Sequence, residues 1–371
     1  MGSSYQVKER EGWLDLSRGF LMCLVFLYHS TSFYKAGVEY NQYSWLFTPI
    51  FLTGFFFVSG YLFTSDWANV SVKKKGLLVL RVILIPYFLF MAAFLLPKLV
   101  WLQYDWRQTV SDILLLRASW FVIAIGVLQM LYAITIKCCK KVSSFLCISC
   151  VYAAIGYGFV VLYRNLPTWF TESPFLYSDA MPGCMPACVN LAFLSTPFFS
   201  LGVLYRRYEE KFRLNANLVL GLGLLSAYLG GVIIDHHTLG TSFTYSCCAC
   251  KNYLLNVLYF LISMAAMIAL AKKVDCIKPL NYIGANSLLF YYLNILMLRV
   301  AGTAYNKAII LLHAEQLKEA MGYGNYIIVT IIAIFATFPA VWLINKYLPL
   351  LTGKKEAYNN ISKKLKLKIY W

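Results

Sequence analysis

Ten long apolar segments dominate the sequence, each of roughly 16 to 24 residues. A helix needs about 20 apolar residues to cross the hydrocarbon core of a bilayer, so segments of this length indicate membrane spans. The expected spans are 14–34, 46–63, 77–100, 120–136, 143–163, 190–205, 217–234, 253–271, 281–300 and 327–345. They predict an all-α fold, a polytopic integral membrane helix bundle with about ten transmembrane helices.

The remainder of the chain leaves no room for a separate soluble domain. Only 13% of the residues are charged, which is about half the share in soluble proteins. Outside the ten segments, about 170 residues are divided among two tails and nine loops. We therefore expect a single transmembrane domain over residues 1–371, which ends in a basic tail at about 346–371.

The basic residues are distributed unevenly between the two sides of this bundle. A formal net charge of +17 would by itself suggest nucleic acid as a partner. However, 24 of the 33 lysines and arginines fall in the two tails, the even-numbered loops and the helix ends beside them. The positive-inside rule then predicts that both termini are cytoplasmic. The charge is explained by orientation in the lipid bilayer, and we expect no nucleic-acid partner.

Two ionisable side chains, Arg18 and His29, lie in the first span. They are 11 residues apart, which is about three helical turns and roughly 16.5 Å, so they share one helix face. Arg18 lies near the cytoplasmic surface and His29 in the outer half. Such residues are costly in a membrane and often functional. A structural interpretation is also open, in which Arg18 reaches the interface beside Asp15 and His29 is hydrogen-bonded inside the bundle.

This Arg-x10-His spacing resembles the signature of the membrane-bound acyltransferase family 3. The likeness continues through short segments of later spans: 55–62, Arg81 with Pro86-Tyr87, Trp120-Phe121, 197–199 with Gly202, and 284–287 followed by Tyr291 and Asn294. The resemblance implies a ten-helix O-acyltransferase of the bacterial inner (plasma) membrane. It also implies acetyl-CoA or another acyl-CoA as the donor, and a glycan or other hydroxyl acceptor.

The resemblance further implies that the donor phosphates bind at the cytoplasmic face. The candidate donor-binding residues are Arg18, Arg81, Ser59, Lys73, Lys74 and Lys75. Guanidinium and ammonium groups suit phosphate, and small residues at Ser59-Gly60 would let a pantetheine arm approach the backbone. Simpler interpretations are an orientation signal for the lysine run and helix packing for Ser59-Gly60.

The candidate catalytic residues are His29, Asn294 and Tyr291. His29 is expected to act as a general base on the acceptor hydroxyl, although an acyl-histidine intermediate remains an alternative. Asn286, Ser287, Tyr291 and Asn294 are candidates for stabilising the oxyanion. Many family members have histidine where this chain has Asn294, and an amide cannot accept a proton near neutral pH. His236 and His237 are either substitutes for it or part of a solvated loop edge.

The long stretches 164–189, 235–252 and 301–326 are expected on the outer side, where the acceptor would arrive. They carry five of the 11 cysteines, namely Cys184, Cys188, Cys247, Cys248 and Cys250. One outer disulfide is as plausible as none, and its pairing stays open. No metal is expected, because Cys247-Cys248-x-Cys250 lacks the spacing of a tetrahedral site.

Three functions are compatible with the sequence: an acyltransferase, a multipass exporter of a polysaccharide or small molecule, and a non-catalytic component of envelope assembly. An enzyme needs the imidazole of His29, whereas an exporter should tolerate Gln and a scaffold should tolerate Ala. For the acyltransferase, we expect Arg18 and His29 to line one interior cavity that is reachable from the cytoplasm.

Overall fold

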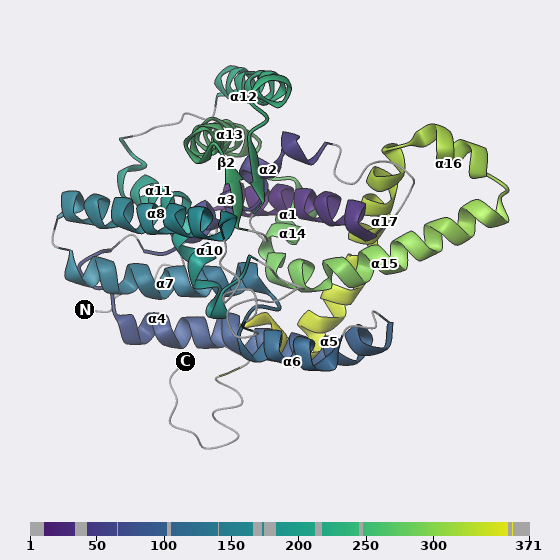
Figure 1. Ribbon diagram of the computed structural model, residues 1–371, viewed down its shortest axis with the longest axis horizontal. Helices are drawn as coiled ribbons and strands as arrows, with labels where there is room; N and C mark the ends of the chain where they lie inside the picture. Colours follow the sequence, from purple (N-terminus) through teal and green to yellow (C-terminus); the bar gives the residue numbers. More distant parts are fainter. Residues whose placement is uncertain are drawn as a thin grey trace, which may run out of the picture.

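The computed structural model describes residues 11–33, 43–64, 66–101, 105–139, 141–165, 173, 183–211, 217–244, 248–354 and 358. These residues are mostly helical, which confirms the all-α prediction (Figure 1). The long helices are α1 (Gly12–Phe33), α5 (Ile85–Trp101), α7 (Trp120–Cys138), α8 (Val142–Arg164), α12 (Leu218–Thr238), α13 (Tyr253–Val274), α15 (Ser287–Leu311) and α17 (Gly324–Tyr347). The short helices are α2 (Thr48–Phe51), α3 (Thr53–Tyr61), α4 (Val72–Val79), α6 (Trp106–Leu114), α10 (Val189–Leu194), α11 (Thr196–Tyr208), α14 (Lys278–Ala285) and α16 (Glu315–Met321).

Shorter elements connect these helices. They are the single turns η1 (Ser44–Leu46), η3 (Pro186–Cys188) and η5 (Pro349–Thr352), the π-helical turn η2 (Leu80–Leu84), and the strands β1 (Ser242–Thr244) and β2 (Ala249–Lys251). The strands pair antiparallel, with Phe243 opposite Cys250, in the connection between α12 and α13. In Figure 1, α12 lies at the edge of the bundle beside α13, and α15 and α16 project from it on the far side.

The ten predicted spans are all helical where the structure describes them, but several are interrupted. Within the described residues, seven helical segments are long and apolar enough to cross a bilayer, or eight if the bent pair of α10 and α11 is one span. The predicted count of ten is therefore not confirmed. The segment 46–63 is divided into α2 and α3 at Leu52, and 281–300 is divided into α14 and α15 at Asn286.

The break between α10 and α11 has an identifiable cause. Pro197 has no N–H and its ring excludes the carbonyl one turn earlier, so the chain bends by 63° near Ser195. Two carbonyl groups beside the bend accept hydrogen bonds from other helices. Tyr253 Oη donates to the Leu194 carbonyl at 2.7 Å, and Tyr132 Oη donates to the Thr196 carbonyl at 3.2 Å. The exposed backbone is thus satisfied by protein, as a break at membrane depth requires.

Close helix contacts depend on glycine. A Cβ atom added at Gly60 in α3 would lie 2.0 Å from the Phe199 carbonyl oxygen of α11. A Cβ atom added at Gly202 in α11 would lie 2.0 Å from the Phe57 carbonyl oxygen of α3. The two helices therefore meet backbone to backbone, as small residues allow in membrane proteins. In the same way Gly284 of α14 lies directly against the Asp15 carbonyl of α1.

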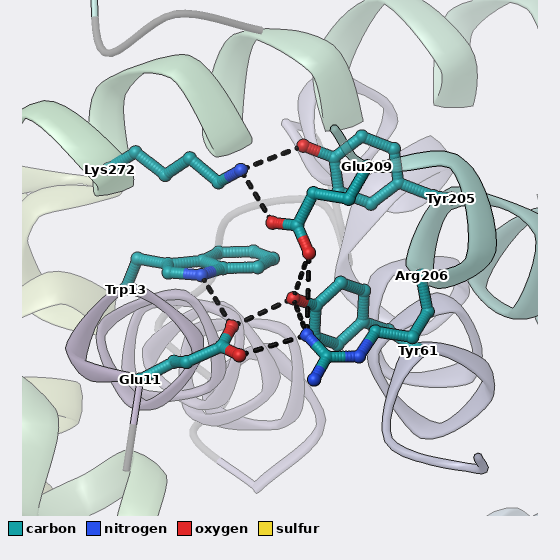
Figure 2. A network of polar contacts seen from close by, with 7 residues as sticks. All are labelled: Glu11, Trp13, Tyr61, Tyr205, Arg206, Glu209 and Lys272. Atoms are coloured by element: carbon teal, nitrogen blue, oxygen red, sulfur yellow. Dashed lines mark hydrogen bonds and ion pairs between the residues drawn. The ribbon is translucent and has the colours of Figure 1, made fainter. Parts of the chain in front are cut away.

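A polar network joins α1, α3, α11 and α13 at one end of the bundle (Figure 2). Its members are Glu11, Trp13, Tyr61, Tyr205, Arg206, Glu209 and Lys272. Arg206 Nη1 contacts Glu11 Oε1 at 2.9 Å and Glu209 Oε2 at 3.3 Å. Lys272 Nζ contacts Glu209 Oε1 at 2.7 Å and Tyr205 Oη at 3.0 Å. Two cations face two carboxylates, so charge is balanced within this network.

Glu11, just before α1, is held ionised by the same network. Burial raises the pKa of Glu11, but hydrogen bonds from Tyr61 and Arg206 outweigh burial and hold the pKa below its ordinary value. Tyr61 Oη lies 2.7 Å from Glu11 Oε2, and Trp13 Nε1 donates to the same carboxylate at 3.0 Å. The charged form of Glu11 thus stabilises the joined helix ends.

Candidate active site

A small cavity near the C-terminal end of α1 contains His29. Its volume is about 90 Å³, and it is lined by residues of α1, α2, α7, β1 and α15. The lining includes Thr48, Phe51, Trp120, Phe121, Thr244 and Tyr291. Aromatic rings form most of the wall, and the two threonines and the Tyr291 hydroxyl add polar atoms. A cavity of this size holds a few small groups.

The His29 ring is half-buried between this cavity and its own helix. Nδ1 is buried, and the Val25 backbone one turn earlier in α1 is within hydrogen-bonding reach of the ring. The Tyr28 ring packs edge-on against the imidazole, with ring centroids 5.6 Å apart. Since Nδ1 is enclosed, Nε2 is the ring nitrogen available to a bound molecule. An uncharged imidazole in this position can accept a proton through Nε2.

Tyr291 is brought to His29 from the far end of the chain. It lies in the first turns of α15, and its ring packs against Phe121 with centroids 5.4 Å apart. Ser119 Oγ lies 3.4 Å from Tyr291 Oη, which fixes the phenol at the cavity wall. The cavity therefore combines an imidazole with a hydroxyl that can donate a hydrogen bond.

Asn294, the third candidate catalytic residue, lies one turn after Tyr291 in α15 but is not part of the wall of this cavity. Its side chain is buried, and Oδ1 has no hydrogen-bond partner in the described part of the chain. A buried amide oxygen without a partner is costly, at about 1–3 kcal/mol. The structure therefore brings His29 and Tyr291 together and leaves Asn294 outside their cavity.

Arg18 lies at the opposite end of α1. Its guanidinium donates to Ser287 Oγ at 2.9 Å and lies 3.5 Å from Asp15 Oδ1. Ser287 is the first residue of α15, so Arg18 joins α1 to the N-terminal end of the helix that carries Tyr291. Asn286, the residue before it, accepts a hydrogen bond from Asn345 Nδ2 at 2.9 Å. Ser287 and Asn286 therefore lie with Arg18 and far from the His29 cavity, so they are not positioned to stabilise an oxyanion there.

The helix face between Arg18 and His29 is filled by side chains. Met22 and Phe26 follow Arg18 at intervals of one turn, and their exposed fractions are 1% and 0%. The Phe26 ring packs against Phe290 with centroids 6.4 Å apart. The described cavity at His29 does not reach Arg18. The lining of this one cavity does not test the predicted shared cavity, which stays a prediction.

Arg81 lies in the π-helical turn η2, which ends at Leu84, two residues before Pro86. Because Pro86 cannot donate to a carbonyl of the preceding turn, the helix widens here, and such π-turns are frequent at functional sites. Arg81 Nε is buried without a hydrogen-bond partner among the described residues. Burial raises the pKa of Tyr358, and the Arg81 guanidinium partly opposes this, so these two side chains lie within electrostatic reach.

The lysine run at the start of α4 is divided between two environments. Lys73 and Lys74 are exposed. Lys75 donates to the Phe63 carbonyl, and its ammonium lies 4.0 Å from the centre of the Phe63 ring. Lys75 is therefore occupied by a contact within the protein, which leaves Lys73 and Lys74 as candidates for a donor.

The segment Ser59-Gly60 is occupied by helix packing. Gly60 is in backbone contact with α11, so no ligand arm can approach the chain there. Ser59 is half-buried beside it. The structure favours the simpler interpretation of this pair, namely close packing of α3 on α11.

The outer histidines and cysteines are separate from the His29 cavity. His236 stacks on Trp45, with ring centroids 4.1 Å apart and planes within 5°. Neither it nor His237 lines the cavity, so they do not substitute for a second imidazole there. The described outer cysteines, Cys184, Cys188, Cys248 and Cys250, are free thiols, and Cys247 lies outside the described residues.

A second, larger groove of about 430 Å³ lies on another side of α1, against α12 and α13. No acidic or basic side chain is among the residues that line it. It offers contact to apolar chains only and has no group suited to proton transfer, so the smaller cavity is the better candidate active site.

Two features of the site were not expected from the sequence. Ser119 orients Tyr291 through a hydrogen bond. The one sequence signal for Ser119 was its position directly before Trp120-Phe121. Arg117 and Asp112 form a buried ion pair, with 3.3 Å between Arg117 Nε and Asp112 Oδ1. Backbone N–H groups of Arg117 and Ala118 also bond to the Asp112 carbonyl, so this pair fixes the turn that carries Ser119 into α7.

Comparison with known proteins gives one clear result. Searches of curated proteins and of solved structures found no significant match. A family model described as an acyltransferase domain matches residues 11–346, which is nearly the whole chain. The matched region includes both the His29 cavity and the Arg18 end of the bundle. The chain therefore belongs to the membrane-bound acyltransferase family 3.

Proposed function

We propose that this protein transfers an acyl group, most simply acetyl, from a cytoplasmic acyl-CoA to a hydroxyl group of a glycan or another envelope acceptor. The acceptor would enter from the outer side of a bacterial inner membrane. The observation that carries the proposal is the cavity in which His29 and Tyr291, 262 positions apart in the chain, face one small space. The family to which the chain belongs supports acyl transfer over the exporter and scaffold alternatives.

In the proposed reaction, His29 Nε2 removes the proton of the acceptor hydroxyl as the oxygen attacks the thioester carbonyl carbon. The carbonyl electron pair moves to oxygen, and the Tyr291 hydroxyl donates a hydrogen bond to this oxyanion. When the carbonyl re-forms, the carbon–sulfur bond breaks and the thiolate takes the proton from the imidazolium. The products are an ester and a free thiol, and His29 returns to its neutral form.

In this proposal, the bound acyl-CoA donor has to extend from one end of α1 to the other. Arg18 would hold donor phosphate, and the thioester arm would extend along the helix face toward His29 over roughly 16.5 Å. Met22 and Phe26 now occupy that face. We infer that these two side chains change rotamer when the arm binds, which opens the path only when a donor is present.

The test is transfer of radiolabelled acetyl from acetyl-CoA to glycan in membranes that contain the protein. We expect His29→Ala and His29→Gln to lower the rate at least about 100-fold, since general-base catalysis contributes that much. Arg18→Ala should raise KM for the donor. His313→Ala is the matched control, because His313 is an exposed histidine in the turn after α15. Unchanged incorporation in the His29 and Arg18 variants would contradict the proposal.

A further inference from the structure

The segment that follows α17 folds back onto the end of the bundle that holds Arg18. Lys354 Nζ donates to Asn345 Oδ1 at 2.8 Å, and Asn345 in turn donates to Asn286 Oδ1 at 2.9 Å. Asn286 precedes Ser287, which accepts the hydrogen bond from Arg18. Lys354 is thus linked by two hydrogen bonds to Asn286, the residue next to the one that binds the Arg18 guanidinium.

The same segment also lies on the π-helical turn that carries Arg81. Gly353 has a φ of +66°, and a Cβ atom added to it would lie 2.9 Å from Val82 Cα and 3.3 Å from the Arg81 carbonyl oxygen. Only glycine combines this conformation with such a close approach. Tyr358 then returns to donate to the Leu350 carbonyl at 2.9 Å. The fold thus places Lys354 directly after a residue in contact with the Arg81 backbone.

The charges in this region are not balanced as they are in the network of Figure 2. There, Arg206 and Lys272 are matched by Glu11 and Glu209. In the described part of the chain, by contrast, neither Arg81 nor Lys354 lies within ion-pair distance of a carboxylate. Arg81 Nε is also buried without a hydrogen-bond partner among those residues. Arg18 is paired with Asp15, so the three cations of this region face one carboxylate among the described residues, and such an excess of positive charge suits a bound anion.

We propose that Lys354, with Arg18 and Arg81, forms a site for a phosphate ester, and that η5 and the two residues after it, 349–354, make one wall of this site. Two molecules offer this chemistry at the cytoplasmic surface: the phosphates of an acyl-CoA donor and the headgroup of an anionic phospholipid. The donor interpretation rests on the proposed function and extends it to the C-terminal segment. Lys354 is exposed and its ammonium can rotate from Asn345 to a phosphate oxygen.

The test measures binding of CoA itself, which cannot transfer an acyl group, to the full-length protein in nanodiscs of zwitterionic lipid. We expect Lys354→Gln to weaken CoA binding about tenfold, the loss typical of one charge-assisted hydrogen bond. Lys354→Arg should retain most of the affinity. Lys346→Gln is the matched control, because Lys346 is exposed near the end of α17 and contacts only the Trp342 and Tyr347 rings. The control should change affinity less than about twofold.

A second arm distinguishes the two sources of phosphate. Nanodiscs that contain anionic phospholipid are compared with zwitterionic ones, and retained lipid is counted by native mass spectrometry. If Lys354→Gln reduces retained anionic lipid and leaves CoA affinity unchanged, the site is a headgroup site and the donor assignment is wrong. If Lys354→Gln changes neither CoA affinity nor lipid retention, the proposed site is refuted. His29→Ala should bind CoA as the wild type does, so a failure of the proposed catalysis is recognised separately.

Discussion

Removing the guanidinium of Arg206 should destabilise the end of the bundle shown in Figure 2, because two carboxylates lose their shared cation. Arg206 contacts Glu11 and Glu209 at once, and the single proton of the Tyr61 hydroxyl can satisfy only one of them. In Arg206→Met, two partly buried carboxylates would face each other, with Lys272 as the remaining cation. The side chains of Arg206, Glu11 and Glu209 are 15%, 28% and 24% exposed.

This degree of exposure determines how much the Arg206→Met substitution should lower the free energy of unfolding. Breaking a fully buried ion pair costs about 3–5 kcal/mol, whereas an exposed pair contributes about 0–1 kcal/mol. The network lies between these limits, so we expect Arg206→Met to lower the free energy of unfolding by about 2–3 kcal/mol. If Glu11→Gln is introduced first, one of the two facing charges is gone. The same Arg206→Met change should then cost about 1 kcal/mol less.

The assay is denaturant unfolding of the purified protein in detergent at neutral pH, for the wild type, both single variants and the double variant. Arg207→Met is the control, because Arg207 is exposed and contacts only aromatic rings, with its guanidinium 4.3 Å from the Trp67 ring. It should cost about 0.5–1 kcal/mol. Equal losses for Arg206→Met and Arg207→Met, or strict additivity with Glu11→Gln, would refute the reasoning.

Three further predictions concern other parts of the molecule. The pKa of Glu11 is held below its ordinary value, so the ionised Glu11 side chain stabilises the folded state. This contribution should be complete above about pH 4.5 and should be lost as the pH falls through the lower folded-state pKa. In unfolding titrations, Glu11→Gln should abolish this part of the acid dependence. Gly202→Ala should lower the free energy of unfolding by at least about 1–3 kcal/mol, because the new Cβ atom meets the Phe57 carbonyl. Gly158→Ala is the control: nothing lies within 4 Å of its new Cβ atom, so thermal or denaturant unfolding should show a neutral or stabilising effect. If Tyr291 stabilises the oxyanion, Tyr291→Phe should lower kcat of acetyl transfer about 100-fold or more with little change in KM, while Tyr347→Phe, whose side chain is exposed at the end of α17, serves as the unaffected control.

The helices could be predicted from hydropathy, but their breaks could not. An apolar window has the same mean hydropathy whether the helix is straight or bent at its centre, so 190–205 was predicted as one span. Pro197 was the available signal, yet proline also occurs in unbroken membrane helices such as α17 at Pro339. A helix can break at proline when hydroxyl groups, such as those of Tyr132 and Tyr253, reach the carbonyl groups beside the break. Whether they reach them depends on tertiary packing.

The candidate site was predictable only along a single helix. Helical periodicity correctly placed Arg18 and His29 in one helix with about three turns between them. It could not show that Met22 and Phe26 fill the space between them, because side-chain packing depends on neighbours such as Phe290. Pairing of His29 with Tyr291 depends on how α15 packs against α1. Lys354 was not identified as a ligand candidate because it lies among other lysines in a basic tail.

The bend at Ser195 ties together parts of the bundle that would otherwise move independently. Since α7 and α13 each hold one carbonyl at this corner, neither half of the broken segment can swing without losing a hydroxyl contact to a different neighbour. The position of α11, which carries Arg206 and leads into Glu209, is therefore coupled through this corner to both α7 and α13.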